Sequence, residues 1–171
     1  QTLQHQEREV TLSWEEFRRK AKLVEQAFAQ RHLSNILWAN DYQNIKEHWD
    51  VEGELNGKTL KFDVKGLKKT NRWDSKTQDE CAWIEGTNVR GQPGWVKGRA
   101  DYIVFERGEY WLMVNREELC NFVQEKLKKN SYATGKKPYH IYQRDGRKDK
   151  ITLIPFKDIE YFLKDIGKLE K

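Results

Sequence analysis

Cysteine and histidine chemistry has little basis in this sequence. The 171 residues include only two cysteines, Cys81 and Cys120, and their separation does not match the spacing of metal ligands. The four histidines are scattered, without the close pairs that typical zinc sites use. We therefore expect reduced structural thiols, as in a cytoplasmic protein, and no zinc site.

Several common functional motifs are also missing. No apolar run approaches the length of a transmembrane helix, and no secretory signal is visible. The glycine patterns of dinucleotide-binding and phosphate-binding loops do not occur, and neither does the Gly-x-Ser-x-Gly turn of serine hydrolases. These absences argue against a membrane protein, a nucleotide-binding enzyme and a serine hydrolase.

The composition is typical of one globular domain covering residues 1–171. Hydrophobic residues make up 37% of the chain and charged residues 35%, which provides a core beneath a polar surface. The net charge of +5 supports a polyanionic partner only weakly. Residues 1–12 are polar and expected to be frayed, and residues 126–171 are expected to be appended to the core.

The strongest local signal is a hairpin with Asn56 and Gly57 at its turn. A type I′ turn needs positive φ at both central residues, and Asn-Gly meets this need best. Counting outward from this turn places Asp50 directly opposite Asp63. The alternation of side chains then predicts two faces, an apolar one with Trp49, Val51, Leu60, Phe62 and Val64, and a polar one with Asp50, Glu52, Asp63 and Lys65.

Two facing aspartates form an unfavourable pair unless something lies between them. Directly opposite residues have β carbons roughly 5 Å apart, and like charges there are destabilising. A divalent cation removes the repulsion, and carboxylate oxygens suit Mg²⁺ or Mn²⁺. Lys65 points into the same space, and such a group is suited to phosphodiester hydrolysis. A solvated polar sheet face would carry the same residues, so the hairpin alone leaves both interpretations open.

Periodicity and turn residues predict further elements on both sides of the hairpin. A helix is expected over about 14–31, after a capping box at Ser13 and Glu16, and a loop or short turn over 32–42. Later elements are a strand over 81–85, a glycine-rich loop over 86–99, a central hairpin over 101–114, a helix capped by Asn115, paired strands over 139–144 and 150–154, and a terminal helix over 156–163.

Basic and aromatic residues gather in the predicted loops. Such residues bind nucleic acid strands by charge and by stacking. The predicted contacts are Lys68, Lys69, Arg90, Trp95, Lys97, Arg99, Lys136 and Lys137. The alternative for the glycine-rich loop is a plain connection that one buried tryptophan anchors.

The order of a helix followed by a hairpin with Asp50 and Asp63-Val64-Lys65 resembles the PD-(D/E)xK nuclease superfamily. The KFDVKG stretch fits its motif well, whereas HWDVEG fits loosely because His48-Trp49 replaces the usual Pro-Asp context. The likeness covers about residues 13–125, and residues 83–102 look like small phage and prophage nucleases. It implies an α/β (α+β) fold with a restriction-endonuclease-like core, in which helices flank a mixed central sheet and its antiparallel hairpin.

The resemblance also implies a metal-dependent endonuclease that hydrolyses DNA. Asp50, Asp63 and the Val64 carbonyl would bind Mg²⁺ or Mn²⁺. Lys65 would orient the attacking water and stabilise the developing charge. It further implies the cytoplasm of a bacterial or phage-infected cell and, as in many superfamily members, a homodimer.

A third acid is common in such sites, and three glutamates compete for the role. Glu85 is the first choice, because its strand could neighbour Asp63. Glu25 on the opening helix comes second, and Glu52 third, since Lys61 is expected to neutralise it. Two other functions stay open, a non-catalytic nucleic-acid-binding module and an RNA-directed nuclease on the same fold.

Overall fold

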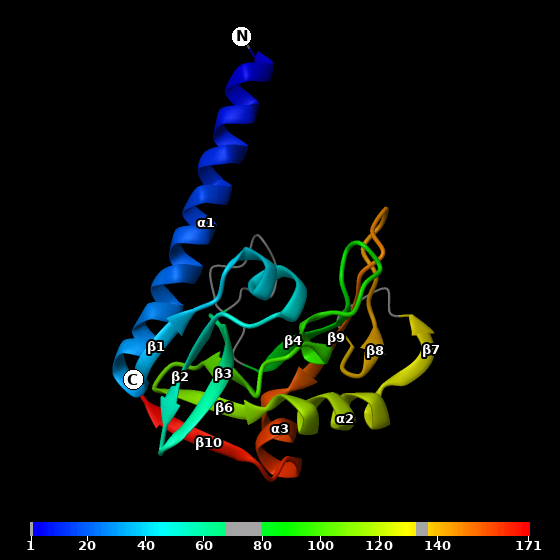
Figure 1. Ribbon diagram of the computed structural model, residues 1–171. Helices are drawn as coiled ribbons and strands as arrows, with labels where there is room; N and C mark the ends of the chain where they lie inside the picture. The colour runs from blue at the N-terminus through cyan, green and yellow to red at the C-terminus, as the bar shows by residue number, and fades with distance from the viewer. Residues whose placement is uncertain (1, 68–79, 133–136) are drawn as a thin grey trace.

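The protein has a mixed α+β fold built around a six-stranded sheet (Figure 1). The computed structural model describes the backbone of residues 2–67, 80–132 and 137–171, and the side chains of residues 15–67, 80–127 and 137–171. The elements are α1 (Thr2–His32), β1 (Ser34–Trp38), the π-helix η1 (Gln43–Glu47), β2 (Val51–Leu55), β3 (Lys58–Lys65), β4 (Cys81–Thr87), the 3₁₀ helix η2 (Trp95–Lys97), β5 (Tyr102–Glu106), β6 (Tyr110–Asn115), α2 (Arg116–Lys126), β7 (Lys128–Tyr132), β8 (His140–Ile141), β9 (Lys150–Pro155), α3 (Phe156–Phe162) and β10 (Ile166–Glu170).

The main sheet is mostly antiparallel, with the strand order β1-β2-β3-β5-β6-β10. Its one parallel pairing joins β3 to β5, where Asp63 lies beside Ile103. A separate two-stranded sheet of β4 and β9 forms part of a second layer. Within the described residues, no helix is long and apolar enough to cross a membrane.

The predicted hairpin is confirmed as β2 and β3. Asn56 and Gly57 have φ values of 52° and 80°, which is the positive-φ pair that a type I′ turn requires. The predicted register holds from Leu55 opposite Lys58 to Val51 opposite Phe62. The turn geometry and the alternation of side chains were therefore sufficient to define these five pairs.

The register changes at Asp50, just beyond the last pair. The Asp50 N–H donates to the carbonyl of Phe62 at 2.8 Å, although Phe62 already pairs with Val51. Two residues opposite one form a β-bulge, which turns the side chains on the bulged strand. Asp50 is therefore not directly opposite Asp63. Trp49, predicted to share the Val51 face, packs instead in the core on the other side of the sheet.

Each face of the sheet is covered by a different core. On the first face, Phe28 of α1 packs against Phe62 and Trp111, with ring centroids 5.5 Å apart in both contacts. On the second face, Ile103 and Phe105 pack with β4, β9, α2 and α3. Because side chains alternate along a strand, Asp63 and Lys65 lie on this second face.

Helix α1 is longer than predicted. It begins at Thr2, where a frayed segment was expected, and its first half projects beyond the sheet (Figure 1). Phe17 has the three- and four-residue apolar spacing that predicts a buried helix face with Val24 and Phe28, yet it is 52% exposed. Among the α1 side chains that the structure describes, Val24, Phe28 and Ala29 of the later turns pack on the sheet. Periodicity alone therefore overestimated how much of the helix is buried.

Two edge strands were missed, and one pairing was wrong. Residues 32–42 were expected to form a loop, but β1 pairs antiparallel with β2. The terminal helix is followed by β10, which pairs with β6. Strand β9 pairs with β4 over its length, and the 139–144 segment joins β9 through an antiparallel bridge between Tyr142 and Ile151 and a hydrogen bond from the Tyr139 N–H to the Leu153 carbonyl, without forming a regular ladder. By contrast, the hairpin of β5 and β6 and the Asn115 cap of α2 are confirmed.

The turn geometry predicts a stability difference between two glycines. A β carbon added at Gly57 or at Gly108 meets no atom within 4 Å, but only Gly57 has a positive φ, of 80°. Gly57→Ala should lower the free energy of unfolding by about 1 kcal/mol, because L side chains disfavour this region. Gly108→Ala is the matched control with little expected effect. Equal denaturant midpoints for the two variants would contradict the assigned turn.

Candidate functional site

Asp50 is held in place by two hydrogen-bond donors. The Val64 N–H donates to Oδ2 at 2.7 Å, and the Asn44 side-chain amide donates to Oδ1 at 2.7 Å. Val64 lies between Asp63 and Lys65 in the sequence, so this contact fixes Asp50 beside the DxK segment. The bulge thus displaces Asp50 from the ladder but keeps its carboxylate next to Asp63.

Asp63 is buried, and one of its oxygens is unsatisfied. Its residue exposure is 4%, and the Lys65 ammonium lies 3.1 Å from Oδ1. Among the described residues, Oδ2 has no hydrogen-bond partner. Buried polar atoms in folded proteins are normally satisfied, so an orphaned carboxylate oxygen indicates a site for a proton, a water or a cation.

Lys65 is fixed between an acid and an aromatic ring. Its Nζ lies 4.4 Å from the centroid of the Trp95 ring, in addition to its ion pair with Asp63. Trp95 in turn packs edge-on against Phe105, with centroids 6.4 Å apart. The ammonium is therefore anchored through η2 to the core of the second layer.

Burial makes both aspartates hard to ionise. The pKa of Asp63 is raised to about 7, mainly by burial and also by the charge of Asp50, against the opposing charge of Lys65. Burial also raises the pKa of Asp50 to about 6, with repulsion from Glu25 as the next cause. Both shifts have the sign that burial gives to a carboxyl group, and the charge of Lys65 offsets them only in part.

Glu25 is the glutamate that the structure brings to the aspartates. It forms a side-chain hydrogen bond with Asp50, and burial raises its pKa, as does the charge of Asp63. The α1 residues Val24 and Phe28 pack on the sheet and so hold this turn of the helix over the site. Lys22 lies 3.9 Å from Glu25 Oε2.

Glu85, the first choice from the sequence, is positioned differently. Its strand β4 pairs with β9, whereas β3 lies between β2 and β5, so the expected strand neighbourhood is wrong. Burial raises the pKa of Glu85, while the charges of Lys65 and His48 lower it. Glu85 therefore approaches the site from the second layer, on the side of Lys65. Its role as a ligand stays a prediction.

A close backbone approach fixes the position of Glu85. A β carbon at Gly94 would lie 2.3 Å from the Glu85 carbonyl oxygen, so glycine is required there. This contact allows the Trp95 N–H to hydrogen-bond to the Glu85 side chain. Glu52 remains on the hairpin opposite Lys61 as predicted, and the Lys61 ammonium lies 5.1 Å from the Trp49 ring centroid.

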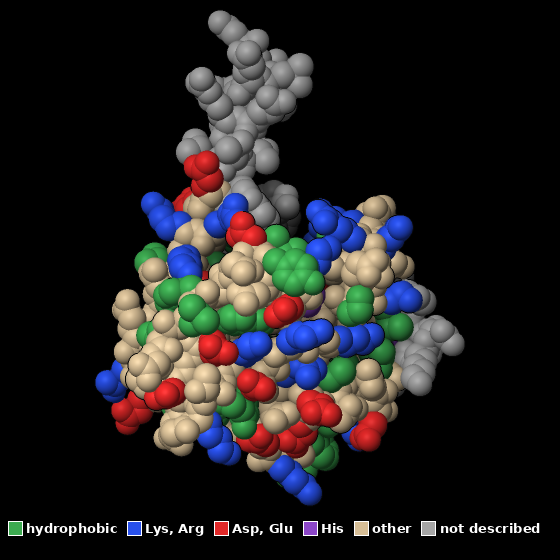
Figure 2. All heavy atoms as spheres, viewed as in Figure 1, with side chains coloured by type: hydrophobic (Ala, Val, Ile, Leu, Met, Phe, Trp, Pro, Cys, Tyr) green, Lys and Arg blue, Asp and Glu red, His purple; other side chains and the backbone are tan. Residues whose placement is uncertain are grey.

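Five of the eight residues predicted to contact nucleic acid lie within the described part of the structure. Arg90, Lys97, Arg99 and Lys137 are exposed, whereas Trp95 is half-buried against Phe105 and Lys65. Figure 2 shows many Lys and Arg side chains across the middle of one face and over its upper part, with acidic side chains mainly below them. The other predicted contacts, Lys68, Lys69 and Lys136, lie outside the described residues.

The oxygen donors fit a hard cation in part. Asp50 and the orphaned Asp63 Oδ2 supply carboxylate oxygens, which suit Mg²⁺ or Mn²⁺. Across the described part of the chain, however, no three His, Cys, Asp or Glu side chains form a group that could hold a metal ion. Mg²⁺ commonly binds through one or two carboxylates and keeps several waters, so two aspartates remain compatible with it.

Sequence reasoning missed Asn44, which binds Asp50 directly. It lies in η1, a π-helix that ends at Glu47 and is followed by His48, whose φ of 59° is left-handed. A β carbon at Gly98 would lie 2.7 Å from the His48 β carbon, so this bend also depends on a small neighbour. Neither a π-helix nor a left-handed histidine has a reliable sequence signature, and such distortions often occur at functional sites.

Comparison of the chain with protein-family models, with curated proteins and with solved structures gives no significant match. The interpretation of this site therefore depends on its own geometry.

The raised pKa values predict that stability falls as pH rises. A carboxyl group with a raised folded-state pKa contributes stability below its unfolded value, near 4, and this contribution is lost as pH rises through its folded value. With a pKa of about 7 for Asp63, the free energy of unfolding without divalent metal should drop by about 2 kcal/mol from pH 5 to pH 8.

Asp63→Asn removes the titrating group and should flatten this profile. Urea denaturation with a chelator present, at several pH values, measures the effect. A variant that retained the full pH dependence of the parent would show that other groups cause it.

Proposed function

We propose that the protein is a Mg²⁺- or Mn²⁺-dependent endonuclease that hydrolyses DNA. The observation that carries the proposal is the buried, unpartnered Asp63 Oδ2, with Asp50 beside it and the Lys65 ammonium 3.1 Å from the other Asp63 oxygen. A polar sheet face in solvent would leave the Asp63 carboxylate hydrated, whereas this carboxylate is buried.

Each residue then has a distinct role. Asp50 and Asp63, together with the Val64 carbonyl, would hold the cation, which supplies Lewis-acid activation of the phosphate and of a bound water. Lys65 places a positive charge next to Asp63, where it would stabilise negative charge that develops on the phosphate. Trp95 and Asn44 keep Lys65 and Asp50 in these positions.

The arrangement of elements supports a restriction-endonuclease-like core. An opening helix covers one face of a mixed sheet, and an antiparallel hairpin carries the acidic residues into its middle. The exposed basic side chains Arg90, Lys97 and Arg99 on the loop that contains η2 would contact phosphates. They come from the same loop as Trp95, which contacts Lys65.

A non-catalytic nucleic-acid-binding module is the second candidate. It is favoured by one observation, that the described residues contain no metal-holding group of three His, Cys, Asp or Glu side chains. In that case the ion pair of Lys65 with Asp63 would be structural. The basic loops would then bind nucleic acid in a salt-sensitive manner without cleaving it.

Plasmid nicking in Mg²⁺ or Mn²⁺ tests the proposed function. Asp63→Asn and Lys65→Met should each reduce the cleavage rate by about 100-fold or more, because each removes charge from the reacting centre. Lys61→Met is the matched control and should retain activity, because Lys61 lies on the same face of β3, two residues before Asp63 and four before Lys65. Circular dichroism checks that all three variants fold.

Two outcomes would contradict the proposal. Undiminished cleavage by the Asp63 and Lys65 variants would show that the site is elsewhere. DNA binding that is equal in the parent and in Asp63→Asn, with no cleavage in any divalent metal, would favour the binding module.

The identity of the third acid can be tested separately. Because Glu25 contacts Asp50 whereas Glu85 interacts with Lys65, Glu25→Gln should weaken Mn²⁺ binding by about ten-fold or more. Glu85→Gln should change Mn²⁺ affinity less, and calorimetric titration distinguishes the two. If Glu85→Gln weakened Mn²⁺ binding more than Glu25→Gln, Glu85 would be the third acid, as the sequence predicts.

A further inference from the structure

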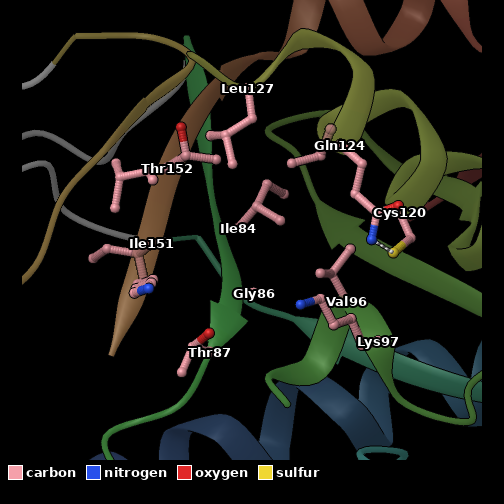
Figure 3. Close-up of a pocket in the computed structure, with 13 residues that line it drawn as sticks. Ile84, Gly86, Thr87, Val96, Lys97, Cys120, Gln124, Leu127, Ile151 and Thr152 are labelled. Atoms are coloured by element: carbon pink, nitrogen blue, oxygen red, sulfur yellow. Dashed lines mark hydrogen bonds between the residues drawn. The ribbon is translucent and has the colours of Figure 1, made fainter. Parts of the chain in front are cut away.

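A second candidate site lies between the two-stranded sheet and α2 (Figure 3). Its cavity has a volume of about 260 Å³. Ile84 and Gly86 line it from β4, so Glu85, which alternates with them, lies on the opposite face of that strand. The cavity is therefore separate from the aspartates and opens on the other side of β4.

The walls of the cavity are mainly apolar. Ile84, Val96 and Leu127 point toward the same space from three different segments (Figure 3). A space with hydrocarbon walls is poorly suited to water, and favours an apolar occupant.

Its charged residues all have the same sign. Lys97 and Lys150 are both exposed and contribute to the lining, which contains no acidic residue. Within the described part of the chain, neither lysine takes part in an ion pair. A ligand whose apolar part fills the cavity would therefore gain from an anionic group placed near one of these lysines.

One polar group of the lining is unsatisfied. Thr152 is 4% exposed, and its hydroxyl has no hydrogen-bond partner among the described residues. The Gln124 amide, by contrast, already donates to the Cys120 sulfur at 3.6 Å. A nucleobase needs several in-plane hydrogen-bond partners, and this lining offers few free ones, which favours a hydrocarbon occupant.

We propose that this cavity binds a small amphipathic anion, namely a medium-chain carboxylate. Its hydrocarbon chain would lie among the apolar walls, and its carboxylate would lie near Lys97 and Lys150. Ligand pockets for drug-sized molecules begin near 300 Å³, so a cavity of about 260 Å³ suits a ligand of about ten heavy atoms. Octanoate has this size and charge.

Gly86 offers a direct way to fill the cavity. A β carbon built there has only the Lys150 carbonyl within 4 Å, at 3.9 Å, and Gly86 has no positive φ. Gly86→Leu should therefore fold, while its side chain occupies the space of the ligand. Isothermal titration of octanoate into the parent should show one saturable site, and Gly86→Leu should abolish it.

The charge requirement is tested with matched ligands and variants. Octanol and octylammonium have the same chain without the anionic group, and both should bind more weakly than octanoate. Lys150→Gln should weaken octanoate binding by about two- to five-fold, as expected for a partly solvated ion pair. Lys148→Gln, an exposed lysine that does not line the cavity, should have no effect.

Each alternative result has a defined meaning. No saturable octanoate binding, or equal binding by Gly86→Leu, would overturn the site. Equal affinity for octanol, or binding of a nucleoside monophosphate in place of octanoate, would overturn the assigned ligand class. All titrations are run without divalent metal and repeated with Asp63→Asn, so they are independent of the proposed nuclease activity.

Discussion

The crowding of a buried carboxyl group, Asp63, by its half-buried neighbour Asp50 is the constraint on which the rest of the structure depends. Asp50 and Asp63 are adjacent and largely removed from water, so burial raises the pKa of both, and the charge of Asp50 adds to the rise at Asp63. Partial compensation comes from the Val64 N–H, the Asn44 amide and the Lys65 ammonium. These donors satisfy both Asp50 oxygens and one Asp63 oxygen. The missing hydrogen-bond donor, the deficit of this site, is therefore at Asp63 Oδ2.

The fold isolates this deficit from solvent by using both of its layers. Helix α1 reaches Asp50 through Glu25 from one direction, and η2 reaches Lys65 through Trp95 from the other. The hairpin alone could not provide these contacts, because they come from α1 and η2. An isolated hairpin is also only marginally stable and would leave the aspartates open to water. The same burial that raises the pKa values also lowers the effective dielectric constant, so any cation bound there would interact strongly.

The predictable part of this site was its local part. An Asn-Gly turn fixes a register within a few residues, so the strand that carries Asp63 and Lys65 followed from the sequence. The departure at Asp50 did not, because a bulge and a preceding π-helix depend on distant contacts such as that between Gly98 and His48. Glu25 was ranked below Glu85 because sequence alone could not show which strand would lie next to β3, nor where α1 would cross the sheet.

The edge strands β1 and β10 show the same limit in the fold itself. Four of the five residues of β1 are exposed, so the strand has no apolar alternation to detect. Strand β10 contains Gly167 and two charged residues, and only its pairing with β6 defines it as a strand. Both strands form through backbone hydrogen bonds to a partner that is distant in sequence or already part of the sheet.

The two interpretations of Asp63, as part of a metal site or of a simple carboxyl pair, also differ in how the repulsion at its unsatisfied oxygen is relieved. A shared proton relieves the repulsion only below the raised pKa values, whereas a divalent cation relieves it at any pH at which the carboxylates can ionise. Cation binding would also stabilise the fold by mass action, in proportion to the logarithm of the ratio of cation concentration to dissociation constant. The strain that destabilises the metal-free protein at neutral pH is thus the same term that would favour binding of Mg²⁺ or Mn²⁺. A structural carboxyl pair gains nothing from being both buried and short of one donor, and this is the physical reason to prefer a ligand-binding role for it.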